Sequence, residues 1–281
     1  MTTEPSLHIG RIPIRHLYPV QPEGLWPAKA FAGEVIPFIA TVFREGHDII
    51  GADLELTAPD GTVTVHPFPQ PDKGVDEWRT TARVTKQGLW SWRVRAYADD
   101  WATWLRAADL KIAAGVDVDV MFQLGLELID RALAGSRKSA KTAPLEVLKT
   151  AFTDTAGDPL ERIALAHAAA VTDALSANRP VSLVTHSDSV PLLVERARAG
   201  YGAWYEFFPR SEGAIRAKDG TVTSGNFVTA QKRLPQIAKD GFDVLYLPPI
   251  HPIGRTNRKG PNNTLVVKDG DPGSPWAIGS S

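Results

Sequence analysis

The stretch that most constrains the fold of this chain is residues 201–265. It consists of an aromatic run, an amphipathic segment and an apolar run that ends in Pro248-Pro249. This spacing predicts a strand, a helix and a second strand, and a connection of this length joins parallel strands. Ligands bind beyond the carboxyl ends of parallel strands in α/β folds. The two segments that follow the predicted strands, residues 209–213 and 250–265, are therefore the candidate ligand loops.

The first predicted strand, residues 204–208, is aromatic and is expected to be buried, because aromatic side chains favour strands through packing. Glu206 stands inside it. A buried carboxylate without a partner is costly, so we expect Glu206 to pair with Arg210 or with a later lysine. Ser211 and Glu212 lie where this strand gives way to a loop.

The loop after the second strand reads HPIGRTNRKGPNNT, residues 251–264. Glycines allow a left-handed backbone and prolines fix φ, so such a loop can hold one shape without a core of its own. Its Arg, Lys and Asn side chains donate hydrogen bonds suited to hydroxyl-rich or anionic ligands. A solvated loop of turn residues would have a similar composition, so both interpretations stay open here. The loop lacks the GxxxxGK[ST] pattern of a phosphate-binding loop.

Residues 12–112 alternate with a period of two. In the clearest case Trp90 and Trp92 are predicted to face inward, while Arg93 and Arg95 face outward. In the predicted strand at residues 36–43, both alternating sets of side chains are apolar. Both faces of this strand are therefore predicted to be covered by other parts of the protein. Turn signals such as Pro59-Asp60-Gly61 separate the strands. We predict an immunoglobulin-like or fibronectin-like β-sandwich over residues 1–114.

The pattern changes at Gly115 to apolar residues at helical spacing. Start signals at Thr142 and Asp158, each close to a proline, predict further helices. We therefore predict an inserted bundle of about three helices over residues 115–178. Residues 179–200 are expected to complete the last strand of the sandwich and to form a linker, and residues 201–281 to form a separate domain.

The formal net charge of -1 gives no electrostatic reason to expect a nucleic acid or an anionic membrane as a partner. The chain has no cysteine, which excludes disulfides and thiol catalysis and fits a reducing cytoplasm. No signal peptide or membrane span is expected. The histidines lack metal-site spacing, so neither a metal nor a cofactor is predicted. Residues 185–188, Thr-His-Ser-Asp, are predicted to form a turn, because adjacent residues cannot assemble a catalytic triad.

Three runs carry a resemblance to a known family: AWYEFFPRS, RLPQIAKDGFDVLYLPPIHPIGRTNRKGPNNTL and DPGSPWAIGS. They resemble the opening of the catalytic barrel in the α-1,4-glucan:maltose-1-phosphate maltosyltransferases, members of glycoside hydrolase family 13 in the α-amylase clan. A strand that ends in Tyr-Leu-Pro-Pro is shared across the clan, whereas HPIG with RKGxNNT narrows the resemblance to the maltosyltransferases within it. The resemblance implies an N-terminal sandwich with a helical insertion, together forming a homodimer, and then the first βαβ unit of a TIM (β/α)8 barrel.

The resemblance also implies substrates and a site. Maltose 1-phosphate would donate a maltosyl unit to an α-1,4-glucan such as glycogen, and Lys259 would contact that unit. Asn262 and Asn263 would shape the same subsite. A retaining double displacement needs an Asp nucleophile and a Glu acid and base, which the family carries on later barrel strands. An eight-stranded barrel takes about 200 residues or more. We therefore expect residues 1–281 to be inactive by themselves, with an open sheet edge in the barrel segment.

Two alternatives remain open at this stage. The chain could act by itself as a dimerisation or glucan-binding module, since sugars stack on exposed tryptophans. Trp26, Trp101 and Trp104 have no assignable side in the sequence pattern. The longer protein could also run another reaction of the clan, such as glucan hydrolysis or trehalose synthesis.

Overall fold

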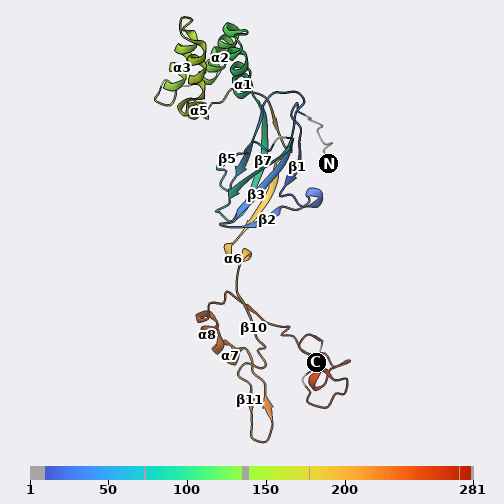
Figure 1. The fold of residues 1–281 in the computed structure, drawn as a ribbon. Helices are drawn as coiled ribbons and strands as arrows, with labels where there is room; N and C mark the ends of the chain where they lie inside the picture. Colours follow the sequence, from blue (N-terminus) through green and yellow to red (C-terminus); the bar gives the residue numbers. More distant parts are fainter. Residues whose placement is uncertain (1–9, 73, 135–138, 177, 272, 280–281) are drawn as a thin grey trace. The chain divides into compact units, whose positions relative to one another are not determined.

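The computed structural model describes residues 10–72, 74–134, 139–176, 178–271 and 273–279. The chain divides into two compact units, Met1–Glu195 and Arg196–Ser281 (Figure 1). None of the helices in these ranges is both long and apolar enough to cross a membrane.

Two sheets form one part of the N-terminal unit. The first is antiparallel with the order β1-β3-β6, and the second has the order β2-β9-β7-β4-β5, with β8 also paired to β7. Among the described residues of the second sheet, β2 and β9 pair in parallel and the other pairs are antiparallel. The strands are β1 (Ile14–Tyr18), β2 (Ala28–Phe31), β3 (Val35–Val42), β4 (Ile50–Thr57), β5 (Val63–Pro67), β6 (Glu77–Arg83), β7 (Gly88–Asp99), β8 (Val181–His186) and β9 (Val190–Glu195). A short 3-10 turn, η1 (Pro22–Gly24), links β1 to β2.

The two sheets pack their apolar faces over one shared core. On β7, Trp90 and Trp92 are buried while Arg93 is exposed, which confirms the predicted alternation. Phe38 of β3 meets Trp92 edge-on across the core, with ring centroids 5.1 Å apart. The expectation of cover on both faces of β3 is wrong, since Pro37 is exposed and only every second side chain is buried.

The helices form a second layer at one end of the sheets, between β7 and β8 in the chain (Figure 1). They have a hydrophobic core of their own. They are α1 (Asp100–Ala113), α2 (Val118–Leu133), α3 (Ala143–Thr153), α4 (Pro159–Ala164) and α5 (Ala169–Ser176), with the 3-10 turn η2 (Leu165–His167) before α5. The predicted start at Asp158 is confirmed, because its side chain accepts a hydrogen bond from the Leu160 amide.

The first helix begins earlier than expected. Residues 100–113 were expected to belong to the sandwich, yet they form α1, directly after β7. Asp99 caps this helix by accepting a hydrogen bond from the Ala102 amide. Trp101 and Trp104 lie on the buried face of α1 and pack in the helical core. The boundary was missed because no glycine or proline separates strand from helix.

The chain returns to the larger sheet in two strands rather than in the single strand expected. β8 and β9 both pair antiparallel with the edge of β7 that β4 leaves free, β9 along residues 88–92 and β8 along residues 95–99. The β7–β8 register shifts between Ala96 and Ala98, and Leu183 opposite this shift has a φ of 51°. The shift is a β-bulge, which bends the strand and redirects its side chains.

The C-terminal unit is built on two parallel strands, as the strand, helix and strand pattern predicted. β10 (Trp204–Glu206) pairs in parallel with β13 (Val244–Tyr246), from Trp204 opposite Val244 to Glu206 opposite Tyr246. Between them come β11 (Ile215–Arg216), β12 (Val222–Thr223), α7 (Phe227–Ala230), η3 (Gln231–Arg233) and α8 (Leu234–Lys239). Short segments α6 (Ala197–Gly200) and η4 (Pro261–Asn263) lie before and after. Phe207, Ala230 and Ile237 form a small core.

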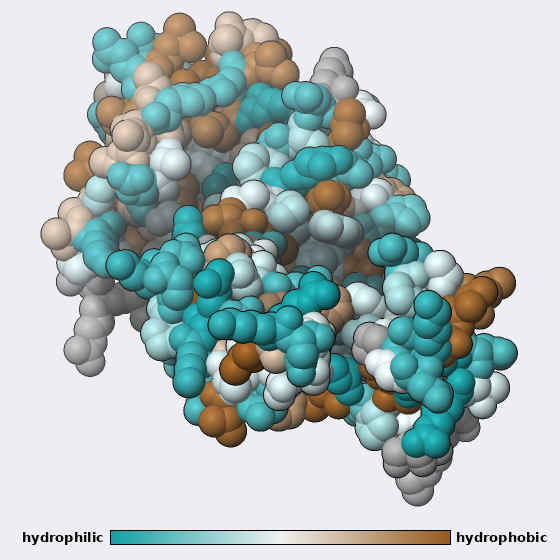
Figure 2. Space-filling model, turned by 90° about the horizontal axis from the view of Figure 1, so that it is seen from below, coloured by the Kyte–Doolittle hydropathy of each residue, from teal (hydrophilic) through white to brown (hydrophobic). Residues whose placement is uncertain are grey.

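The expectation that residues 204–208 form a buried strand is wrong for most of the run. Trp204 is 65% exposed and Glu206 is exposed, so Glu206 needs no buried partner, and Arg210 donates to the His251 carbonyl instead. Within the described residues β10 has only β13 as a strand neighbour. Apolar groups stand exposed among hydrophilic ones in the space-filling view (Figure 2).

Candidate functional site

A pocket of about 200 Å³ lies where both parallel strands of the C-terminal unit end. Residues 208–210 follow β10 and residues 248–250 follow β13, and both segments line it together with residues 225–227 and Pro275. This is the edge at which α/β folds bind ligands. Both predicted ligand loops contribute to the pocket, whereas the segment 225–227 was not predicted.

The segment before α7 is held in place by its own residues. Asn226 accepts a hydrogen bond from the Thr229 amide, and Thr229 accepts one from the Asn226 amide, which forms a capping box. Gly225 donates to the Arg210 carbonyl at 2.7 Å. A Cβ at Gly225 would lie 2.2 Å from the Glu212 carbonyl oxygen, so only glycine permits this close approach. The third wall of the pocket is therefore set by local chemistry.

The pocket walls are mainly aromatic rings and prolines with a few polar groups. Phe227 and Ile250 are exposed apolar side chains, and Phe208 meets Trp276 edge-on with centroids 5.4 Å apart. The Arg210 guanidinium reaches the His251 carbonyl through one nitrogen, at 3.2 Å. Such a surface suits a ligand with apolar faces and polar edges.

The loop after β13 is organised by Arg258. Its guanidinium donates to three carbonyl oxygens: Gly254 at 3.0 Å, Ile253 at 2.7 Å and Asp271 at 3.2 Å. A planar group with several donors is suited to join backbone segments in this way. The sequence pattern did not single out Arg258, because it stands beside Lys259 in one basic run.

The three predicted site residues lie together in this loop and do not line the pocket. Lys259 is half-buried, while Asn262 and Asn263 are exposed on η4. Both asparagines have left-handed φ values, 52° and 63°, which asparagine tolerates better than most residues. In the part of the chain that the structure describes, no hydrogen bond or ion pair engages their side chains or that of Lys259. Their role in binding stays a prediction.

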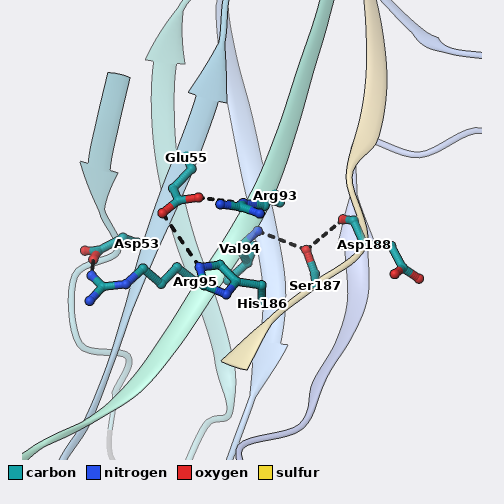
Figure 3. Close-up of polar contacts among 8 residues, drawn as sticks. All are labelled: Asp53, Glu55, Arg93, Val94, Arg95, His186, Ser187 and Asp188. Atoms are coloured by element: carbon teal, nitrogen blue, oxygen red, sulfur yellow. Dashed lines mark hydrogen bonds and ion pairs between the residues drawn. The ribbon is translucent and has the colours of Figure 1, made fainter. Parts of the chain in front are cut away.

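Residues 185–188 do not form a triad, as expected (Figure 3). Ser187 Oγ accepts from the Val94 amide at 3.0 Å and donates to the Asp188 carbonyl at 2.9 Å. His186 Nε2 lies 3.9 Å from Glu55 Oε1 instead, and burial, together with the nearby Arg93 charge, lowers the pKa of His186. The predicted turn is wrong for its first half, since Thr185 and His186 are the last residues of β8.

Comparison with known proteins extends over both units. The family model described as α-1,4-glucan:maltose-1-phosphate maltosyltransferase, domain N/S, matches residues 10–196. The chain is 48% identical, over 100% of its length, to α-1,4-glucan:maltose-1-phosphate maltosyltransferase 2 of Streptomyces coelicolor. It is 41% identical over 90% of its length to the protein of that name from Corynebacterium glutamicum, and 37% identical over 96% to one from Mycobacterium tuberculosis.

The fold and the site together define a multidomain protein. Its first unit consists of two packed sheets with inserted helices, and its second unit carries a pocket at the end of a pair of parallel strands. The chain belongs to the α-1,4-glucan:maltose-1-phosphate maltosyltransferase family. It spans 41%, 38% and 42% of the lengths of the three relatives named above.

Proposed function

We propose that this chain is the N-terminal part of an enzyme that transfers maltosyl units from maltose 1-phosphate to the non-reducing end of α-1,4-glucans. The observation that carries the proposal is the 48% identity to a maltosyltransferase, which extends over both units of the chain. Such an enzyme would work in the cytoplasm, which the absence of cysteine fits.

The finer architecture is part of the proposal. The packed sheets would be an immunoglobulin-like sandwich that carries an inserted helical bundle, and the pair would form a homodimer. The C-terminal unit would open a TIM (β/α)8 barrel. The parallel pairing of β10 and β13 supports this, because barrel strands are parallel and carry their site at their carboxyl ends.

Lys259 is proposed to contact the maltosyl group, with Asn262 and Asn263 shaping the same subsite. The three hydrogen bonds of Arg258 support this role, because they hold the backbone beside Lys259 in one conformation. The ammonium group has no partner among the described residues, so binding a sugar hydroxyl would cost it no internal hydrogen bond.

The chemistry would be a retaining double displacement with an Asp nucleophile and a Glu acid and base. The proposal assigns neither role to a residue of this chain. Purified residues 1–281, incubated with maltose 1-phosphate and glycogen, are therefore expected to release no phosphate. Measurable turnover by this polypeptide would contradict the assignment of the chemistry to other residues.

The proposal is tested in the longer enzyme through Lys259→Ala. Loss of a charged hydrogen bond worth about 1–3 kcal/mol would lower kcat/KM for maltose 1-phosphate roughly 5- to 150-fold. Lys268→Ala is the matched control, since Lys268 is an exposed lysine of the same region. An unchanged kcat/KM would remove Lys259 from the site. Consumption of glucan and water without any use of maltose 1-phosphate would instead support a hydrolase.

A further inference from the structure

The loop that carries Lys259 is paired with a later segment of the same unit. Residues 252–254 lie beside residues 277–279, joined by an antiparallel bridge between Ile253 and Ile278. Two backbone hydrogen bonds, of 2.8 and 2.9 Å, also connect these segments. Because the bonds join backbone groups, they fix the start of the loop against the later segment.

Arg258 makes a second connection between the same parts of the unit. Its guanidinium donates to the carbonyls of residues 253 and 254 on one side and to that of Asp271 on the other. Its aliphatic stem lies against Gly273, where a Cβ would come within 2.9 Å of the Arg258 Cγ. Gly273 has a φ of 73°, so glycine suits this position both for its backbone and for the space that it leaves.

Both segments that Arg258 joins also contribute to the pocket at the strand ends. Pro275 lines that pocket and follows Gly273 closely in the sequence. Residues 248–250 line the same pocket and continue directly into the loop of Lys259. The contacts of Arg258 therefore connect the pocket wall with the loop that presents Lys259.

The backbone is also held on the other side of Lys259. The Gly260 amide donates to the Thr264 carbonyl at 2.9 Å, and a Cβ at Gly260 would lie 2.0 Å from the Val266 carbonyl oxygen. Only glycine permits this close approach. Both neighbours of Lys259 in the sequence are thus fixed, while its ammonium group has no partner among the described residues. A group held in this way can meet a ligand without first being ordered.

We propose that Arg258 is a positioning residue, which sets where Lys259 stands relative to the pocket at the ends of β10 and β13. The contact of Lys259 with the maltosyl group rests on the proposed function, whereas the part of Arg258 rests on its own bonds. An arginine is suited to this task, because its planar group holds several donors in a fixed fork. A lysine would keep the charge but offer a single point of contact.

The first measurement is steady-state kinetics of the longer enzyme with Arg258→Met and Arg258→Lys. Both are expected to lower kcat/KM for maltose 1-phosphate about 5- to 100-fold, because a misplaced contact group stabilises the transition state less. The KM for glycogen is expected to change less than about 2-fold, since Lys259 is assigned to the maltosyl group of maltose 1-phosphate. Arg216→Met is the matched control, because Arg216 is an exposed arginine of the same unit.

A double variant separates positioning from general support of the loop. If Arg258 acts through Lys259, adding Arg258→Met to Lys259→Ala should lower kcat/KM less than about 2-fold beyond Lys259→Ala alone.

Hydrogen exchange resolved by peptide, in the same longer enzyme, gives a readout that needs no activity. Arg258→Met is expected to lower amide protection in residues 252–266 at least about 10-fold. Protection of α8, which Arg258 does not contact, should stay unchanged and serves as the internal control.

Several results would overturn the inference. Parent kinetics in Arg258→Lys would mean that the charge matters rather than the fork. Additive losses in the double variant, or an equally raised KM for glycogen, would make Arg258 a general support of the unit. Unchanged exchange in residues 252–266, or an equal loss of protection in α8, would contradict the positioning directly. A parent enzyme that does not use maltose 1-phosphate would contradict the proposed function instead, and the exchange comparison would still accept or reject the role of Arg258.

Discussion

Arg162 is the clearest place to test how the helical layer is held together. The side chain comes from α4, and the residue is only 7% exposed. Its guanidinium donates to the carbonyl oxygens of Ala151 at 3.0 Å and Phe152 at 2.7 Å, in the last turn of α3. It also stacks on the Phe122 ring of α2, 3.7 Å from the centroid. One side chain therefore joins three helices.

The perturbation is Arg162→Met, which keeps most of the volume and removes the charge. Carbonyls at the end of a helix lack intrahelical partners, so the two bonds satisfy groups that would otherwise be unpaired. Two hydrogen bonds to a charged donor contribute about 3–6 kcal/mol, and a desolvated cation–π contact about 2 kcal/mol. Removing the charge recovers several kcal/mol of desolvation. The expected net loss is about 2–4 kcal/mol of local stability.

The assay is hydrogen exchange resolved by peptide, because a protein of two units need not unfold in one step. A loss of about 2–4 kcal/mol lowers protection of α2 and α3 amides roughly 30- to 1,000-fold. Amides of β4 and β7 in the sheet core serve as the internal control and should keep their protection. Equal protection of α2 and α3 in Arg162→Met and the parent protein would refute the reasoning, because Arg162 would then only fill space.

Two further predictions concern packing and pH. Gly125→Ala gains about 1 kcal/mol of helix propensity, but its Cβ would lie 2.4 Å from the buried Trp104 ring and 2.8 Å from that of Phe152. The cost of overpacking, about 1–3 kcal/mol, should exceed this gain, so amide hydrogen exchange in α2 should become faster. Slower exchange would contradict this prediction. Burial raises the pKa of Tyr97 from 10.0 to about 12, with a contribution from the Asp53 charge. Because the folded pKa is the higher one, stability is lost as pH rises from 10 through 12, and thermal melting of Tyr97→Phe should depend less on pH there.

The sheet region was the most predictable part of the fold. Alternation alone places Trp92 inside and Arg93 outside, because the period of a strand decides the face of each side chain. The hairpin from β4 to β5 follows from Pro59-Asp60-Gly61, where Gly61 has the positive φ that the turn requires. These features depend on residues close together in the sequence.

The candidate site was less predictable, for a physical reason. Arg258 and Lys259 are adjacent basic residues. Only the folded loop shows that Arg258 donates to three carbonyls, while Lys259 donates to none among the residues that the structure describes. Residues 225–227 reach the pocket because Gly225 approaches the Glu212 carbonyl, a contact between segments that no local pattern encodes. Trp204 was expected to be buried but is exposed, because its burial also depends on contacts with other segments and not on the local pattern.

The helical insertion illustrates how one residue can serve two layers. Its two ends are already neighbours, because Ala98 pairs with Ser182 and Asp99 with Val181 in the β7–β8 ladder. Asp99 caps α1 through one oxygen and pairs through the other with Arg179, at 2.7 Å, just before β8. A loop closed by adjacent strands costs little more entropy as it lengthens. An insertion at this position can therefore carry its own core and leave the sheet register intact. For the same reason, the helical pattern can follow the strand pattern directly in the sequence, with no loop between them.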